Sequence, residues 1–206
     1  LPEIKTAANL DVKVTYDKFK IPIRTTFPYT HEEALRWQEQ AKKTLDEKEK
    51  LVIYYPKDME GVERLKEAAR ELVAKGDIGK TIGPRTLDKF KVDYWLATQA
   101  VNQSKRIEAL PANPAPYLMP MQAIRIGTTV FVTFPAEVFT EIGLSVKQKS
   151  PYANTFILGV AGGFNGYIAT AAEYIEGGYA VNVSPYAPQA EQALIDASME
   201  LIGRVK

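Results

Sequence analysis

The 206-residue sequence contains no cysteine and a single histidine, His31. Without cysteine the chain can form no disulfide, no thiolate nucleophile and no cysteine-based zinc finger. One histidine cannot complete the nitrogen-rich ligand set of the usual zinc site, and a serine triad would need this same residue as its base. No nucleophile-elbow motif accompanies any serine. We therefore expect His31 to be a surface residue in the first turn of a helix.

Long apolar runs and an excess of one charge are also missing. No run approaches the roughly 20 apolar residues that span a bilayer, and the first residues carry neither an initiator methionine nor a signal-peptide pattern. A mature or cleaved product would begin in this way. The 26 basic residues nearly balance the 25 acidic ones, so no overall field attracts nucleic acid, and we expect no such partner.

The apolar periodicity that is present alternates between strands and helices. Residues 10–24 alternate as a strand or hairpin does, and Pro22 indicates an edge position. Thr30 and Glu33 form a capping box at the start of a helix of about five turns. Further helices are predicted over 59–74, 88–108, 138–147 and 188–204, a hairpin over 121–127 and 129–134, and a buried strand over 155–160. The prolines between residues 111 and 120 predict an extended crossing before the hairpin. Together these segments predict an α/β fold, a mixed sheet with flanking helices. The length of 206 residues predicts one folded unit.

Two carboxylates are predicted to lie where strands give way to loops or helices, which is where ligands usually bind in α/β folds. They are Glu137, after Phe134-Pro135-Ala136, and Glu173, before Tyr174. A purely structural role is also open for Glu137, because an acid in the first turn of a helix complements the helix dipole. Glu141, one turn later, is expected to be exposed.

A glycine-rich segment, residues 159–170, follows the last predicted strand. It lacks the lysine and hydroxyl of a phosphate-binding loop and the glycine spacing of a dinucleotide fingerprint, so a tight structural turn and a close approach to a ligand both stay open. Tyrosines gather here, at positions Tyr167, Tyr174, Tyr179 and Tyr186. A tyrosine is usually a core or interface residue, and only neighbours with chemical function would suggest more.

Two motifs in this half of the chain resemble the neutral/alkaline ceramidase family. The first runs from Arg125 through the apolar strand to the turn over residues 135–140, and the second runs from Asn165 to Tyr179. The similarity is good over about 120–187 and general before that. It implies that residues 1–206 are the carboxy-terminal portion of one ceramidase-like catalytic domain, with a variable strand and helix region over 1–110 and the metal-site region over 120–187. The sheet would then be completed by an amino-terminal part that is not in this chain.

In that family a catalytic zinc ion is held by two histidines, a glutamate and a tyrosine. The resemblance places the glutamate at Glu137 and the tyrosine at Tyr167, and both residues are implied to take part in catalysis. The two histidines would belong to the missing amino-terminal part. Departures from the family pattern affect the expected pocket lining but not the two ligands, and they fall at Gly162, Phe164, Ala169 and Ala180.

The resemblance implies a zinc-dependent hydrolase of an N-acyl amide bond in a ceramide-like lipid. The chain would act together with the histidine-bearing polypeptide of the same precursor and would be inactive alone. Two alternatives stay open: a related hydrolase of another amide, an ester or a lactone, and a non-catalytic binding module that retains the fold. The resemblance also implies an extracytoplasmic location, secreted or periplasmic, and association with a membrane surface.

Overall fold

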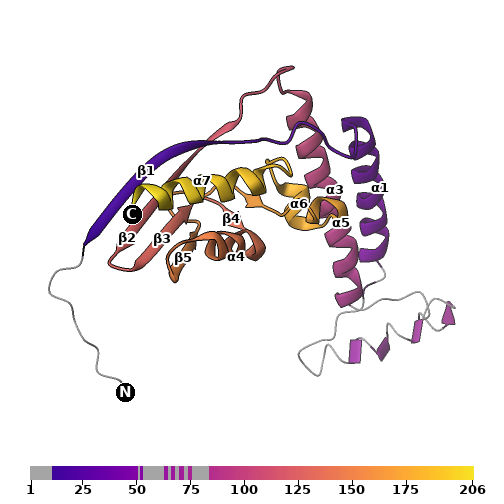
Figure 1. Cartoon of the computed structure of the whole chain (residues 1–206). Coiled ribbons are helices and arrows are strands. Elements are labelled where there is room, and N and C mark those ends of the chain that lie inside the picture. The colour runs from indigo at the N-terminus through magenta and orange to yellow at the C-terminus, as the bar shows by residue number, and fades with distance from the viewer. Residues whose placement is uncertain are drawn as a thin grey trace. The chain divides into compact units, whose positions relative to one another are not determined.

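The structure of the chain is a computed structural model (Figure 1). It describes residues 11–50, 52, 63–64, 66–67, 70–71, 74–75 and 84–206. The chain forms two compact units, whereas its length predicts one. One consists of Leu1–Phe27 with Arg106–Lys206, and the other of Pro28–Lys105. That both units belong to one catalytic domain stays a prediction.

The first unit is built on a mixed sheet, as predicted. Within the described residues the strand order is β1-β2-β3-β5, with antiparallel pairing from β1 to β3 and parallel pairing of β3 with β5. The strands are β1 (Val12–Ile21), β2 (Tyr117–Ile126), β3 (Thr129–Phe134) and β5 (Asn154–Gly159). A second, two-stranded sheet joins β4 (Glu137–Val138) to β6 (Tyr167–Ile168). The α/β fold class is therefore confirmed.

Two helices cover one face of the larger sheet. Helix α4 (Thr140–Lys149) makes the crossover from β3 to β5, and α7 (Ala190–Arg204) packs against β1, β2, β3 and α4. Their apolar faces bury a single core with the sheet, to which Met121, Val132, Phe134, Ile142 and Leu201 contribute fully buried side chains. Two short helices, α5 (Glu173–Glu176) and α6 (Tyr179–Val183), lie between β6 and α7 in the chain.

Local sequence signals place most of these elements. The predicted hairpin turns between Ile126 and Thr129, and β1 is an edge strand, as Pro22 indicated. The expected proline-rich crossing is shorter than predicted, because β2 already begins at Tyr117 and includes Pro120, which lies opposite Lys18 in β1. Proline has no N–H to donate, but its carbonyl and its fixed φ are compatible with an extended strand.

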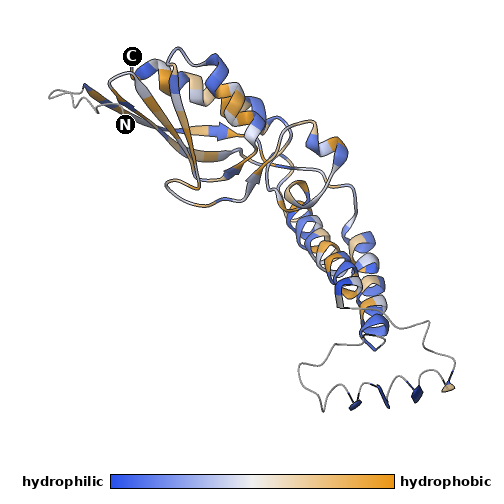
Figure 2. Cartoon of the chain, turned by 90° about the horizontal axis from the view of Figure 1, so that it is seen from below, coloured by the Kyte–Doolittle hydropathy of each residue, from blue (hydrophilic) through white to orange (hydrophobic). Residues whose placement is uncertain are grey.

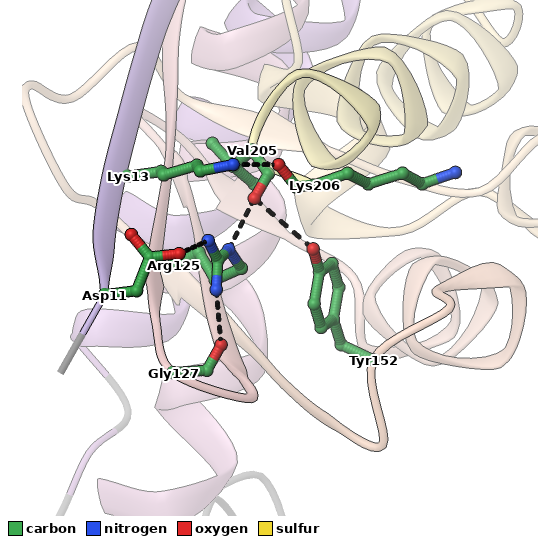
Figure 3. A network of polar contacts seen from close by, with 7 residues as sticks. All are labelled: Asp11, Lys13, Arg125, Gly127, Tyr152, Val205 and Lys206. Carbon is green, nitrogen blue, oxygen red and sulfur yellow. Dashed lines mark hydrogen bonds and ion pairs between the residues drawn. The ribbon is translucent and has the colours of Figure 1, made fainter.

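Arg125 in β2 joins three chain segments at one end of the sheet (Figure 3). Its guanidinium donates to the carbonyl oxygens of Val205 at 2.5 Å and Gly127 at 2.8 Å, and it forms an ion pair with Asp11. The Tyr152 hydroxyl donates to the same Val205 carbonyl at 3.3 Å. A buried cation at the carboxy-terminal end of α7 satisfies a carbonyl that the helix leaves unpaired and complements the helix dipole.

The second unit contains two long helices, α1 (His31–Glu49) and α3 (Pro84–Glu108), the latter ending just beyond the unit boundary. The predicted capping box starts α1: the Glu33 amide donates to the Thr30 hydroxyl, and the Thr30 amide donates to the Glu33 carboxylate. Helix α3 begins four residues before the predicted 88–108. Most of the helix predicted over 59–74 lies outside the described residues. No helix that the structure describes is long and apolar enough to cross a bilayer.

The prediction that fails most clearly is the burial of residues 155–160. Residues 155–159 lie in β5, which is at the edge of the sheet. The Phe156 and Leu158 side chains are exposed, as is that of Val160 just after the strand. Figure 2 shows hydrophobic residues, coloured orange, along several strands of this sheet. An apolar run that is typical of a buried strand therefore meets solvent on one side.

Candidate functional site

Glu137 and Tyr167 are direct neighbours in the two-stranded sheet. Strand β4 follows β3 after Pro135 and Ala136, and β6 pairs with it in parallel, with Glu137 opposite Tyr167. The Glu137 amide donates to the Gly166 carbonyl at 3.0 Å, and the Phe139 amide donates to the Ile168 carbonyl at 3.1 Å. Paired residues in adjacent strands point to the same side, so this register brings the two side chains together. Both are half-buried.

The two side chains interact directly. The Tyr167 hydroxyl donates a hydrogen bond to the Glu137 carboxylate, and this bond is the main reason that the pKa of Tyr167 is raised to about 12. Partial burial and the negative charge of the carboxylate raise it further. The phenol is therefore held in its protonated form beside an anionic oxygen.

The glycine-rich segment brings β6 alongside β4. Gly166 has φ 74°, and a Cβ built there would lie 3.2 Å from Cδ of Pro185, so both the conformation and the space call for glycine. Earlier in the segment Val160 has φ 55°, a conformation that β-branched residues rarely adopt. Its amide donates to the Ala136 carbonyl at 3.1 Å, directly before Glu137. The segment is thus a structural turn that also positions the candidate site.

A third side chain, Tyr179, contacts this pair. Its ring meets that of Tyr167 edge to face, with 5.4 Å between centroids and an interplanar angle of 76°. It also hydrogen-bonds Tyr167. Tyr179 opens α6 directly after Gly178, whose φ of 106° turns the chain toward the site. Tyr179 belongs to the second motif identified in the sequence, but periodicity alone gave it no role.

Buried polar groups fix the backbone behind Tyr167. The fully buried Ser184 hydroxyl donates to the Tyr167 carbonyl at 2.7 Å, and the Tyr174 hydroxyl donates to the Tyr186 carbonyl at 2.7 Å. The buried Arg24 guanidinium donates to the Val181 carbonyl in α6 at 2.7 Å and lies over the Tyr174 ring. Burial lowers the pKa of Arg24 and raises that of Tyr174. The sequence gives no signal for Arg24 or Ser184, because their partners are distant in the chain.

The other candidates do not join this group. Glu137 lies in β4, ahead of the first turn of α4, and that turn instead contains the exposed Glu141. Glu173 begins α5. His31 is half-buried rather than a simple surface residue, and its Nδ1 lies 3.1 Å from the Ser104 hydroxyl within the second unit. Within the described part of the chain, no group of three or more His, Cys, Asp or Glu side chains could hold a metal ion.

Part of the chain is similar to neutral ceramidases of known structure. One of these structures, described as ceramidase complexed with C2, is 24% identical over 42% of this chain and 15% of that chain, with a TM-score of 0.39. Another is the crystal structure of neutral ceramidase from Pseudomonas aeruginosa, 26% identical over 43% of this chain and 16% of that chain, with a TM-score of 0.36. Both matches cover less than half of this chain.

No family model matches the sequence, and no curated protein matches it. The chain spans 15% and 16% of the length of the two ceramidase chains. The activity, substrate and metal of those larger proteins are therefore proposals for this chain.

Proposed function

We propose that this chain provides two oxygen ligands, from Glu137 and Tyr167, to the catalytic zinc site of a ceramidase-like amidohydrolase. The other ligands would be histidines of an amino-terminal polypeptide from the same precursor. The substrate would be a ceramide-like lipid whose N-acyl amide bond is hydrolysed. The observation that carries this proposal is the side-by-side placement of Glu137 and Tyr167 by the β4–β6 register.

The donor set suits zinc as half of a site. Zinc in catalytic sites takes three protein ligands or more from nitrogen, carboxylate and related donors and leaves one position open. The Glu137 carboxylate and the Tyr167 phenol are adjacent and only half-buried, so a cation and further ligands can reach them. When bound, zinc polarises an amide carbonyl and lowers the pKa of a bound water. Without the cation, Glu137 keeps the proton on Tyr167.

The chain's own residues would then orient and stabilise the substrate. Glu137 would be a charged ligand, fixed by the hydrogen bond from its amide to the Gly166 carbonyl. Tyr167, supported by Ser184 and Tyr179, would present its phenol oxygen to the cation and to the oxyanion that develops during amide hydrolysis. The extracytoplasmic location and the membrane-surface association implied by the resemblance stay predictions.

Metal analysis of the complete two-polypeptide assembly tests the proposal. We expect the assembly to contain about one zinc ion per pair and to hydrolyse an N-acyl sphingosine. Glu137→Gln and Tyr167→Phe should each reduce zinc content and lower activity by ~10²-fold or more, since each removes a ligand. Glu141→Gln is the matched control, because Glu141 is an exposed acid only four residues away.

Retention of full zinc content and activity by Glu137→Gln would contradict the ligand assignment. If zinc is bound and both residues are needed but N-acyl sphingosine is not cleaved, the alternative of a hydrolase acting on another amide, an ester or a lactone replaces ceramide as substrate. If the intact assembly binds no metal, the chain is a non-catalytic binding module.

A further inference from the structure

The larger sheet has one face that no described helix of its own unit covers. We call it the outer face, and it is formed by alternate residues of β1, β2, β3 and β5, on the side away from α4 and α7. The side chains of Met119, Met121 and Val132 point to the helix side and are fully buried. Their strand neighbours therefore point outward, because successive side chains alternate between faces.

The outer face is largely apolar at one end. The register aligns Val12 with Ile126, Val14 with Ile124, and Phe131 with Phe156 across four adjacent strands. Val14 is 62% exposed and Phe156 is 48% exposed. Scattered exposed apolar residues are ordinary, but a contiguous patch beyond a few hundred Å² marks an interaction surface.

Two features give this end the shape of a binding surface. The rings of Phe131 and Phe156 are stacked, with 5.3 Å between centroids and 19° between planes, so each aromatic side chain is held in place by the other. Beside them, at the β2–β3 turn, lies a hollow of about 330 Å³ lined by Ile126, Phe131 and the turn residues. Rigid aromatic groups beside a hollow are the usual anchors of protein interfaces.

Charge limits what can cover this face. Among the outward-pointing residues of the four described strands, the charged ones are Lys18 and Lys20, both exposed and both at the end opposite the apolar patch. Full overlap with a second copy would place these lysines either on each other or on the other copy's apolar end. The face instead complements a partner that is apolar over one end and carries carboxylates over the other.

We propose that the outer face binds a second β-sheet, apolar at one end and acidic opposite Lys18 and Lys20, that belongs to the histidine-bearing amino-terminal polypeptide. Two sheets packed face to face at about 10 Å would bury the patch in a common core. This inference rests on the proposed function for the identity of the partner. It places the contact on the sheet face, separate from the Glu137–Tyr167 pair.

Co-expression of this chain with the polypeptide encoded directly upstream of Leu1, each with its own tag, tests the inference. Dissociation constants are measured by sedimentation velocity on purified pairs. Val14→Lys and Phe156→Lys should each weaken association at least tenfold while circular dichroism and melting stay unchanged, since both positions are exposed. Val92→Lys is the matched control: it is the same substitution, at a valine that is 54% exposed on α3. Changing Lys18 and Lys20 together to glutamate should weaken association severalfold.

Each outcome decides the proposal. Unchanged association of both patch variants overturns it, and so does failure of the wild-type pair to associate. Sedimentation of the chain alone as a dimer that Val14→Lys dissociates also overturns it, in favour of a second copy. Zinc content separates this proposal from the proposed function. If association depends on the outer face but no zinc is bound, the outer face stands and the metal site fails. If zinc binds while the patch variants associate normally, the metal site stands and the outer-face proposal fails.

Discussion

Glu137 and Tyr167 acquire their chemistry from each other. Neither residue is unusual by itself, and an acid after a strand can serve merely to complement a helix dipole. Their register in β4 and β6 places the carboxylate where it accepts a hydrogen bond from the phenol. The strength of that interaction can be measured without any metal or substrate.

Glu137→Gln should lower the pKa of Tyr167 from about 12 toward the ordinary value of 10.0. The substitution removes the negative charge that disfavours the phenolate and weakens the hydrogen bond to the phenol. The measurement is a ¹³C NMR titration of the tyrosine Cζ signals, with Tyr167→Phe used to assign the resonance. Glu141→Gln should leave the titration unchanged, and an equal shift in that control would contradict the assignment.

The raised pKa also sets the direction of a pH dependence. The folded state binds the Tyr167 proton more tightly than the unfolded state does. The resulting stabilisation is therefore fully present below pH 10 and is lost as the pH rises from about 10 to about 12. The free energy of unfolding, measured by urea titration, should fall less between pH 10 and pH 12 in Tyr167→Phe than in the wild type. An identical loss in both proteins would show that other groups cause it.

At the scale of elements, the end of α7 is held by one buried side chain. Arg125 donates to the Val205 and Gly127 carbonyls, so it connects the helix end to the β2–β3 turn (Figure 3). Lysine cannot reproduce this geometry, because its ammonium is a single point rather than a planar fork.

Arg125→Lys should lower the free energy of unfolding by about 2 kcal/mol, because hydrogen bonds from a buried charged donor are lost. Tyr152→Phe removes only a 3.3 Å hydrogen bond to the same carbonyl and should cost less than about 1 kcal/mol. Urea unfolding followed by circular dichroism measures both. A larger loss for Tyr152→Phe would show that Arg125 does not hold this helix end.

The start of α1 provides a second element-scale prediction. Thr30→Ala removes the side chain that accepts the Glu33 amide, and it should destabilise α1 by about 1 kcal/mol. Amide hydrogen exchange in the first turns of α1 measures this change locally. Thr25→Ala, at an exposed position ahead of the helix, is the control and should leave that exchange unchanged. Equal exchange in both variants would show that the capping box does not stabilise the helix.

For the whole molecule, the metal site and the outer face are expected to act independently. A chelator should remove zinc from the two-polypeptide assembly, to which this chain offers only the oxygen donors of Glu137 and Tyr167. Removal of zinc should abolish hydrolysis. The polypeptides should nevertheless stay associated, since the contact rests on burial of apolar side chains such as Val14 and Phe156. Sedimentation velocity before and after chelation measures this, with zinc re-addition as the control. Dissociation on chelation would mean that the metal holds the two polypeptides together.

The sequence by itself determined the features that depend on neighbouring residues. Apolar period, capping residues and turn glycines act over a few positions, so the hairpin around Gly127, the capping box of α1, and α7 could all be predicted. Glu137 and Tyr167 were chosen by their resemblance to a family motif, and their role as zinc ligands stays a prediction.

Only the tertiary structure decided what depends on contacts between distant segments. The β4–β6 register joins residues 30 positions apart. The edge-to-face contact between the Tyr179 and Tyr167 rings depends on the turn before α6. The exposure of Phe156 is another feature that the local sequence pattern does not predict. Residues 155–160 have the apolar pattern of a buried strand, but periodicity reports only which residues avoid water, and the tertiary structure decides whether this chain or a partner covers them.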